Sequence, residues 1–384
     1  MPSQSTPPQT RRKSTAWPSS FFIYFLSPVL VATLLVYHLD SFDPVHLPLH
    51  ELTQPPLKAP FTNHAILKSS ELVGQGQLNA PEDILYDAVS GVFYTGCADG
   101  WIKRVTVNDS VADMAVSNLV NTGGRPLGLA LDRTSNALIV ADAYKGLLRV
   151  SGDGEIEVLT VEAEGVKFKL TDEVTVAEDG TIYFTDASFD YSVAESSFDI
   201  LEGKPRGRLL RYDPATKQTE VLLHNLYFAN GVEVSPDQQS LVFCETPMRR
   251  CRKYYIDGEK KGKVEKFADN LPGFPDNIHY DGEGHYWIAI PGGANALLDY
   301  TFRQPILRKT MAILTKHLGP LHSEKNSGVF VVDLEGKPVA HYSDPQLAML
   351  TSGVKIGTHL YCGSIVHNHI LRLDLAKHPA QPTT

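Results

Sequence analysis

Short apolar runs alternate with polar turns along most of this chain. One such unit, GVFYTGCADGWIKRV, starts at Gly91, and a similar unit, NALIVADAYKGLLRV, starts at Asn136. Each unit contains an apolar or aromatic run of strand length, a short polar turn and usually a second run that carries Arg or Lys. Six such runs recur, and their central residues are Phe93, Ile139, Tyr183, Val242, Trp287 and Tyr361.

The order of runs and turns favours a β-propeller. Turn sequences such as EDG at 178–180 and DGEG at 281–284 come directly before apolar runs, and no helical periodicity separates these units. Regularly spaced short strands are typical of propeller blades, whereas parallel βαβ folds need a helix in each connection. We therefore predict an all-β fold, a six-bladed β-propeller over residues 61–375.

One segment of the body, residues 294–327, departs from this pattern. It contains ANALLDYTFRQPILRKTMAILTKHLG and is the only part of the body that we predict to be helical. Its position after the fifth unit indicates an insertion. Such an insertion would either cover one face of the propeller or pack on its side.

The N-terminal region contains an uncharged apolar stretch behind a basic one. The basic residues are Arg11 to Lys13, and the 17-residue stretch 21–37 that follows has the minimum length for a transmembrane helix. We predict a signal anchor, with a cleaved signal peptide as the alternative. The chain would then consist of a cytosolic basic tail (1–20), the anchor or signal (21–37), a proline-rich linker (38–60), the propeller (61–375) and a C-terminal tail (376–384).

This topology would place the propeller in the secretory lumen, in the endoplasmic reticulum or the vacuole, as a type II membrane protein or a cleaved lumenal one. There, Asn108 in Asn-Asp-Ser is a usable glycosylation site. Oxidising compartments also permit disulfides. Cys244 and Cys251 are close enough in sequence for a local bridge, but free thiols at all four cysteines are an alternative.

Charge excludes one class of partner. The chain has 35 Lys and Arg against 44 Asp and Glu, a formal net charge of −9. Nucleic-acid binding needs a basic surface that neutralises phosphates, and no basic cluster interrupts the body. We therefore expect no nucleic-acid partner, and we expect a monomer that acts on a small molecule.

Acid and amide side chains come just before the apolar runs of four different units. They are Glu82, Asp172 with Glu173, Asn230, and Asp276 with Asn277. A propeller brings equivalent points of its blades to one central channel, so these side chains should meet. Oxygen donors without Cys or His suit a hard divalent cation such as calcium or magnesium. The alternative is a polar channel mouth that holds only ordered water.

Several motifs resemble those of the strictosidine synthase-like family of plants and of the animal adipocyte plasma membrane-associated proteins. They include YFTDAS from Tyr183, YFANGVEVSPD from Tyr227 and LPGFPDNI from Leu271, and the likeness runs in order over residues 61–375. It implies a six-bladed propeller in the secretory system. The wider superfamily includes the paraoxonases and the gluconolactonase/regucalcin proteins, which hold a central metal.

The resemblance assigns roles to individual residues. It implies that Glu82, Asn230 and Asp276 are metal ligands and that Asn277 is a further ligand of the paraoxonase type. Asp172 stands where those hydrolases usually have Asn, so it keeps an oxygen donor and adds a charge. In the regucalcin type, the residue equivalent to Asp276 is also the catalytic base.

Two departures from the resemblance limit the chemistry. Strictosidine synthases use a glutamate of the last blade as a base, and Thr351 stands at that position; Glu173 from another blade is a candidate replacement. Paraoxonases use a histidine where this chain has Leu127. The other histidines lack helical zinc spacing, and no Gly-x-Ser-x-Gly motif occurs.

These observations predict a metal-dependent, arylesterase-like hydrolase of small esters or lactones, with a divalent metal, first of all calcium, and with Asp276 as the catalytic residue. One alternative is a lyase of the strictosidine synthase type, which condenses an amine with an aldehyde. The other alternative is a propeller that binds a ligand without catalysis.

Overall fold

The computed structural model describes residues 24, 27–48, 50–319 and 325–383. The chain divides into two compact units, Met1–Asp43 and Pro44–Thr384. The first unit contains helix α2 (Ser27–Leu39), which has 13 residues. Among the described residues, no helix is both long enough and apolar enough to cross a bilayer, and most of residues 21–26 of the predicted anchor lie outside them.

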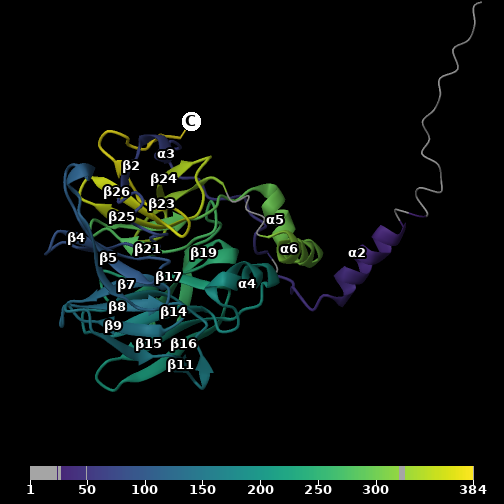
Figure 1. Cartoon of the computed structure of the whole chain (residues 1–384), viewed down its shortest axis with the longest axis horizontal. Helices are drawn as coiled ribbons and strands as arrows, with labels where there is room; N and C mark the ends of the chain where they lie inside the picture. The colour runs from purple at the N-terminus through teal and green to yellow at the C-terminus, as the bar shows by residue number, and fades with distance from the viewer. Residues whose placement is uncertain (1–23, 25–26, 49, 320–324, 384) are drawn as a thin grey trace, which may run out of the picture. The chain divides into compact units, whose positions relative to one another are not determined.

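The second unit contains a ring of six antiparallel sheets, the blades of a propeller (Figure 1). Blade 1 contains β3 (Leu85–Asp87), β4 (Val92–Gly96), β5 (Trp101–Thr106) and β6 (Val116–Asn121); blade 2 contains β7 (Pro126–Asp132), β8 (Ala137–Asp142), β9 (Gly146–Val150) and β10 (Ile156–Thr160). Blade 3 contains β13 (Leu170–Val176), β14 (Ile182–Ser188), β15 (Gly207–Asp213) and β16 (Gln218–Leu226); blade 4 contains β17 (Ala229–Val234), β18 (Ser240–Glu245), β19 (Arg250–Tyr255) and β20 (Val264–Ala268). Blade 5 contains β21 (Ile278–Tyr280), β22 (His285–Ile290), β23 (Ser327–Asp333) and β24 (Pro338–Asp344); blade 6 contains β25 (Leu350–Ile356), β26 (His359–Ser364) and β27 (Ile370–Asp374).

The predicted six-bladed propeller is confirmed. Each of the six apolar runs found in the sequence forms the second strand of its blade, from β4 around Phe93 to β26 around Tyr361. These second strands are buried on both faces, which explains why they are apolar without strict alternation.

A strand from the beginning of the propeller completes its last blade. Strand β2 (Glu71–Val73) pairs antiparallel with β27, with Leu72 opposite Leu371. In blade 5, β1 (Phe61–Asn63) adds in parallel to β24, and β28 (Gln381–Pro382) pairs with β1. Both ends of the propeller chain are therefore hydrogen-bonded into blades, and the ring closes between blades 6 and 1.

Apolar packing seals this junction. Phe93 of β4 and Tyr361 of β26 are buried in one cluster together with Val73 of β2 and Ile370 of β27. The two aromatic rings meet edge to face, with their centroids 5.7 Å apart. Burial of an aromatic side chain of this size contributes about 1.5–3 kcal/mol, so the junction depends on these contacts as much as on strand pairing.

The first strands of the blades line the central channel, and the strands of adjacent blades contact each other. Irregularities interrupt the pairing of four of these inner strands, at 126–129, 171–174, 229–232 and 350–352. A bulge re-aims side chains at such points and is common near functional sites. The inner strands also approach closely: a Cβ on Gly128 would lie 2.3 Å from Oε1 of Glu173, so only glycine fits there.

Helical insertions extend from blades 3 and 5. The predicted helical segment forms α5 (Ala296–Arg303) and α6 (Pro305–Leu318). The prediction that no other part of the body is helical was wrong, because α4 (Ser196–Glu202) lies between β14 and β15 and contacts α6. A helix of seven residues is too short to show periodicity. The remaining short elements are α3 (Ile66–Ser69), the 3₁₀ turns η2 (Val111–Asp113), η3 (Val193–Glu195) and η4 (Thr246–Met248), and the hairpin β11 (Glu162–Ala163) to β12 (Val166–Lys167).

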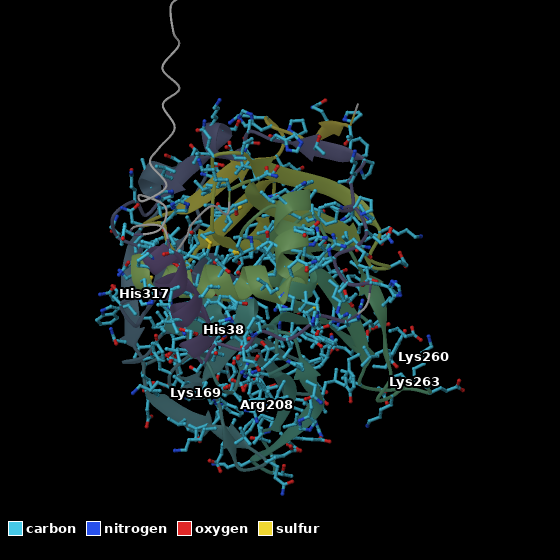
Figure 2. The ribbon with its side chains drawn as sticks, turned by 90° about the vertical axis from the view of Figure 1, so that its right-hand side faces the viewer. His38, Lys169, Arg208, Lys260, Lys263 and His317 are labelled. Carbon is cyan, nitrogen blue, oxygen red and sulfur yellow. A yellow bond between two sulfur atoms is a disulfide. The ribbon has the colours of Figure 1, made fainter. Side chains whose placement is uncertain are left out.

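Buried arginines hold these insertions in place. Arg308 of α6 donates to the carbonyl oxygens of Leu201 and Glu202 in α4, at 3.0 and 3.1 Å, and to that of Val45. A second buried arginine, Arg208 of β15 (labelled in Figure 2), pairs with Asp186 of β14 at 2.7 Å and donates to carbonyl oxygens of the β11–β12 hairpin. Removal of one carbonyl partner would leave a buried guanidinium partly unsatisfied, which costs free energy. The contacts of Arg308 therefore fix the position of α6 against α4.

Replacement of Phe93 by alanine tests the junction between blades 6 and 1. Phe93 is 0% exposed, so Phe93→Ala should lower the free energy of unfolding by roughly 3–5 kcal/mol. Val89→Ala is the matched control, because Val89 of the same blade is 96% exposed and should change the stability by less than about 0.5 kcal/mol. Urea unfolding followed by circular dichroism measures both, and equal effects would contradict the assigned packing.

Candidate functional site

Residues from four blades meet around one small cavity in the channel. Glu82 of blade 1, Asp172 of blade 3, Asn230 of blade 4 and Asp276 of blade 5 line a cavity of about 110 Å³. Asp172 and Asn230 lie on the bulged parts of β13 and β17, while Glu82 and Asp276 lie just before β3 and β21. The structure therefore brings together four of the five residues predicted as metal ligands.

The fifth predicted ligand, Asn277, lies behind the cavity wall. It is 0% exposed, and its Nδ2 donates to both carboxylate oxygens of Glu82, at 3.2 and 3.3 Å. The Oδ1 atoms of Asn277 and of Asn230 are buried and have no hydrogen-bond partner among the described residues. The amide oxygen of Asn230, which lines the cavity, is thus available for a ligand at the place where the carboxylates converge.

Like charges crowd this site. Burial, together with Asp276 and Asp83, raises the pKa of Glu82 well above its usual value, against the opposing effects of Arg125 and the Asn277 amide. Burial, followed by the charges of Glu82 and Asp186, likewise raises the pKa of Asp172. Without a further cation, the carboxyl groups resist simultaneous ionisation.

Arg125 is a basic residue of this region that the sequence reasoning missed. Its Nη2 donates to the carbonyl oxygen of Ala80 at 3.0 Å, and its backbone N–H donates to Oδ1 of Asp142 at 3.0 Å. Its charge lowers the pKa of both Glu82 and Asp172. The sequence did contain a sign of its role, because Arg125 directly precedes the inner strand β7, just as the predicted acids stand at the start of inner strands in other blades.

Apolar side chains form the walls of the cavity. They are Leu127, Leu170, Val193, Ile200, Phe228, Phe274, Pro291, Met349 and Ile365. Val193 and Ile200 come from η3 and α4, so the helix that the sequence did not reveal forms part of the wall. Phe302 of α5 packs against Phe274, with ring centroids 5.4 Å apart. The site is therefore an apolar pocket with an acidic floor.

Thr351 lines the same cavity, and its Oγ1 donates to the backbone carbonyl oxygen of Glu82 at 2.8 Å. The position of the glutamate base of strictosidine synthases is thus at the site. Here it is occupied by Thr351, whose hydroxyl holds the backbone of Glu82 in place. Glu173, the residue suggested to replace that base, does not line this cavity and faces a second one. Glu173 is therefore not placed to serve as the base of a condensation at this site.

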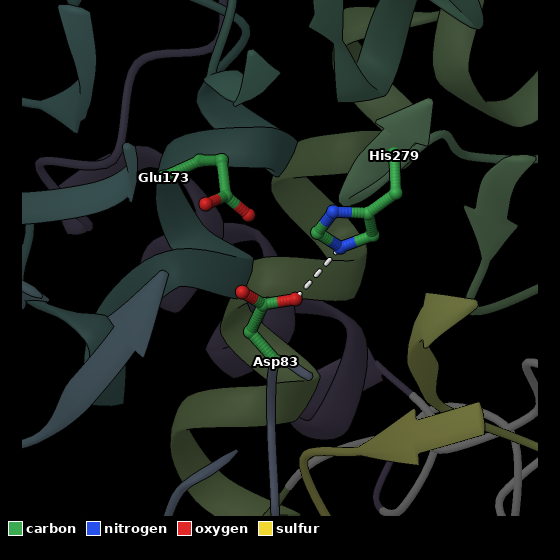
Figure 3. Close-up of side chains that lie close together, drawn as sticks. All are labelled: Asp83, Glu173 and His279. Atoms are coloured by element: carbon green, nitrogen blue, oxygen red, sulfur yellow. Dashed lines mark hydrogen bonds and ion pairs between the residues drawn. The ribbon is translucent and has the colours of Figure 1, made fainter. Parts of the chain in front are cut away.

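A second polar cluster consists of Asp83, Glu173 and His279 (Figure 3). His279 Nε2 bonds Oδ1 of Asp83 at 2.8 Å, and Ser352 donates to the same oxygen at 2.9 Å. Burial would raise the pKa of Asp83, but the charge and hydrogen bond of His279 lower it. The cluster was not predicted from the sequence, because its single histidine has no partner at helical zinc spacing. Asp83 and Glu173 directly follow Glu82 and Asp172, and His279 follows Asp276 by three positions, which was the available signal.

Two other predicted sites lie on blades 1 and 4. Asn108 is exposed, and its Nδ2 donates to the carbonyl oxygen of Asp113 at 3.0 Å. A disulfide joins Cys244 of β18 to Cys251 of β19, which face each other across the two strands. Cys97 and Cys362 are buried free thiols.

The donor set of the first site fits a hard divalent cation. It offers three carboxylates and the unpartnered Oδ1 of Asn230, all of them oxygen donors, and the raised pKa of Glu82 indicates that the cluster lacks positive charge. Calcium and magnesium prefer such ligands, and calcium tolerates irregular geometry. The residues present are therefore compatible with the predicted cation.

Solved structures of other proteins share this fold. A gluconolactonase from Xanthomonas campestris superposes with a TM-score of 0.58 at 17% identity, over 86% of this chain and 98% of that one. The calcium-binding protein regucalcin from Agrobacterium tumefaciens gives a TM-score of 0.56 at 16% identity, over 83% and 95%. At such identities, these likenesses show the shared fold.

Sequence comparison identifies nearer relatives. The family description "Strictosidine synthase" matches residues 172–259, and "Strictosidine synthase-like, N-terminal" matches residues 59–105. The chain is 56% identical over 368 residues to Protein STRICTOSIDINE SYNTHASE-LIKE 6 of Arabidopsis thaliana, covering 94% of this chain and 98% of that protein. It is 32% identical over 407 residues to the adipocyte plasma membrane-associated protein of Gallus gallus, covering 97% and 95%. The chain thus belongs to the strictosidine synthase-like family of six-bladed propellers.

Proposed function

We propose that this protein is a hydrolase of small esters or lactones that depends on a divalent cation, first of all calcium. The observation that carries the proposal is the convergence of Glu82, Asp172, Asn230 and Asp276 from four blades on the floor of an apolar cavity. Three buried carboxylates at one point cost free energy unless a cation compensates them. The likeness to a gluconolactonase and to the calcium-binding regucalcin adds support at the level of the fold.

The cation would be held directly by Glu82, Asp172, Asn230 and Asp276, and Asn277 would supply a further oxygen ligand. When bound, the cation would polarise the substrate carbonyl and lower the pKa of a bound water. Thr351 and Asn277 both bond Glu82, one through its backbone carbonyl and the other through its carboxylate. These contacts would keep the Glu82 carboxylate directed into the site while substrate enters and leaves.

Asp276 would act as the general base. Its side chain lines the cavity and is 9% exposed, more than Asp172 at 4% or Glu82 at 2%. It is therefore the carboxylate of the three that water reaches most easily. A base next to the attacking water contributes about 10²–10⁴-fold to the rate. The walls, including Phe228 and Met349, would hold the apolar part of the ester and exclude bulk water.

Membership of the family also suggests a second function, the condensation of an amine with an aldehyde, which is the reaction of strictosidine synthase itself. That reaction needs a base at the position of Thr351. The Thr351 hydroxyl cannot be such a base, and it already donates to Glu82. We therefore favour hydrolysis over condensation at this site.

We also propose that the propeller is a monomer in the secretory lumen, held there by a membrane anchor within residues 21–37. The disulfide between Cys244 and Cys251 supports an oxidising compartment, and the exposed side chain of Asn108 is accessible for glycosylation.

Removal and restoration of metal test the hydrolase proposal. The chelated full-length protein should lose hydrolysis of phenyl acetate and small lactones, and calcium should restore it. Asp276→Ala should lower kcat/KM by about 10²-fold or more, because it removes the general base. Asp99→Asn, an exposed acid on the β4–β5 turn, is the control and should behave as wild type. Turnover that is independent of metal and of Asp276, or product from tryptamine and secologanin, would overturn the proposal.

Carboxylate crowding predicts how stability depends on pH in the metal-free protein. Raised folded-state pKa values mean that the native state binds more protons than the unfolded state above about pH 4. The free energy of unfolding should therefore fall as pH rises toward the raised pKa values of Glu82 and Asp172. Asp172→Asn should weaken this fall and, in chelator at pH 7, stabilise the protein by on the order of 1 kcal/mol.

Thermal and urea unfolding between pH 5 and 8 measure this dependence, with Asp99→Asn as the control. Saturating calcium should reverse the order of wild type and Asp172→Asn, because the amide of the variant keeps an oxygen donor but loses the negative charge that strengthens calcium binding. A lower stability of Asp172→Asn in chelator would show that Asp172 is held by contacts other than those of a metal site.

Glycosylation tests the lumenal topology. Full-length protein made in the presence of microsomes should carry one glycan, which Asn108→Gln removes and endoglycosidase releases. Asn118→Gln replaces an exposed asparagine of the same blade outside a sequon and should leave the glycan in place. The propeller should also resist added protease until detergent opens the vesicles. An unglycosylated, protease-sensitive propeller would contradict the proposed topology.

A further inference from the structure

One wall of the proposed hydrolase cavity belongs to no blade strand. Val193 of η3 and Ile200 of α4 line the cavity, and we call this part the η3–α4 wall. Both side chains pack against one apolar cluster, whose buried members include Leu127, Leu170 and Phe228. A helix of seven residues is too short to be stable through its own hydrogen bonds. The position of this wall therefore depends on the contacts that α4 makes with other segments.

Arg308 of α6 holds the C-terminal end of α4, which lies beside α6 (Figure 1). Its Nη1 donates to the carbonyl oxygens of Leu201 and Glu202, at 3.0 and 3.1 Å. The last carbonyl groups of a helix have no partner within the helix, and a basic side chain is favoured there. Leu201 directly follows the wall residue Ile200. Fully buried Arg308 is thus the cap of the helix that forms the wall.

Val45, in the segment that precedes β1, completes this attachment. Its N–H donates to the carbonyl oxygen of Glu202 at 3.0 Å, and its own carbonyl oxygen accepts from Arg308 Nη2. A Cβ on Gly203 would lie 2.4 Å from Arg308 Nη1, so the guanidinium is closely packed against the end of α4. One side chain of α6 therefore holds both α4 and the segment before β1.

Arg206 holds the same helix from blade 3. It pairs with Asp199 and Glu202 of α4, at 3.5 and 2.5 Å, and with Asp190 at 2.9 Å. These ion pairs do not involve α6. Without Arg308, α4 would therefore stay attached to blade 3, while its C-terminal end would lose its contact with α6.

We propose that Arg308 is a positioning residue that sets the size of substrate the site accepts. By holding α4, it keeps Val193 and Ile200 against the cavity, so that the site takes esters and lactones with small acyl groups and rejects long ones. The cavity has a volume of about 110 Å³, and a longer acyl chain would need the wall to move. This inference rests on the hydrolase function proposed above.

Arg308 itself does not line the cavity and acts through α4. The acidic floor does not depend on it, because Asp172 and Asn230 lie on the inner strands β13 and β17. Removal of the guanidinium should therefore change selectivity between substrates and leave turnover of the smallest substrate largely intact.

Two esters of different acyl length test the inference in the full-length, calcium-loaded protein. The ratio of kcat/KM for phenyl acetate to that for phenyl hexanoate does not depend on how much of a preparation is folded. Arg308→Met should lower this ratio by about tenfold or more, mainly through a lower KM for the hexanoate, since one methylene group in an apolar pocket is worth about 10–200-fold. Arg308→Lys keeps a cation with fewer donors and should have a smaller effect. Arg303→Met replaces an exposed arginine of the same insertion and should keep the wild-type ratio.

A double variant shows whether Arg308 acts through the wall. Ile200→Ala should lower the ratio by itself, because it shortens a wall side chain. Arg308→Met added to Ile200→Ala should then change the ratio by less than about twofold, because both substitutions act on the same wall. Fully multiplicative effects, or a wild-type ratio in a folded Arg308→Met protein, would overturn the proposal.

Binding of ketones separates this inference from the hydrolase function. Acetophenone and hexanophenone resemble the two esters but cannot be hydrolysed, and isothermal titration gives the ratio of their Kd values. If the wild type hydrolysed neither ester, the hydrolase function would be wrong, but Arg308→Met and Ile200→Ala should still shift the Kd ratio in favour of hexanophenone. Equal Kd ratios in the wild type and both variants, or no binding of either ketone to any of them, would overturn the role of the wall.

Discussion

Closure of the ring is the constraint on which the site depends. Strand β2 pairs with β27, and Phe93 packs against Tyr361, so blade 1 is held against blade 6. Only in the closed ring does the carbonyl oxygen of Glu82 meet the hydroxyl of Thr351. No blade contains more than one of the four predicted ligands that line the cavity, and a ring opened at this junction would separate Glu82 of blade 1 from Thr351 of blade 6. The chemistry of this protein is therefore a property of its tertiary structure rather than of any local motif.

The fold was accessible from the sequence because each blade repeats the same local pattern. Turns with glycine and apolar second strands recur from unit to unit, and the propeller follows from their number. Helix α4 was not accessible, since its seven residues show no periodicity and its role depends on packing against α6. The consequence reaches the site, because η3 and α4 place Val193 and Ile200 in the cavity wall.

The candidate site was accessible in part for the same reason. Acids and amides before the inner strands predicted that Glu82, Asp172, Asn230 and Asp276 meet. The position of Asn277 behind Glu82 could not be predicted, because one residue along a bulged or irregular segment decides whether a side chain faces the cavity. The pairing of Asp83 with His279 was hidden for a related reason: the two residues lie 196 positions apart and carry no shared motif.

The position of both clusters on the same two backbone segments has a consequence for how this channel varies. Glu82 and Asp83 are neighbours on one backbone, as are Asp172 and Glu173, yet the members of each pair serve different clusters. A shift of either segment that relaxes one cluster displaces the other. The two clusters are linked because adjacent residues of the same backbone segment belong to different clusters. A lineage that altered the chemistry of one cluster would thus have to keep the backbone positions on which the other depends, which favours substitution of side chains over insertion or deletion.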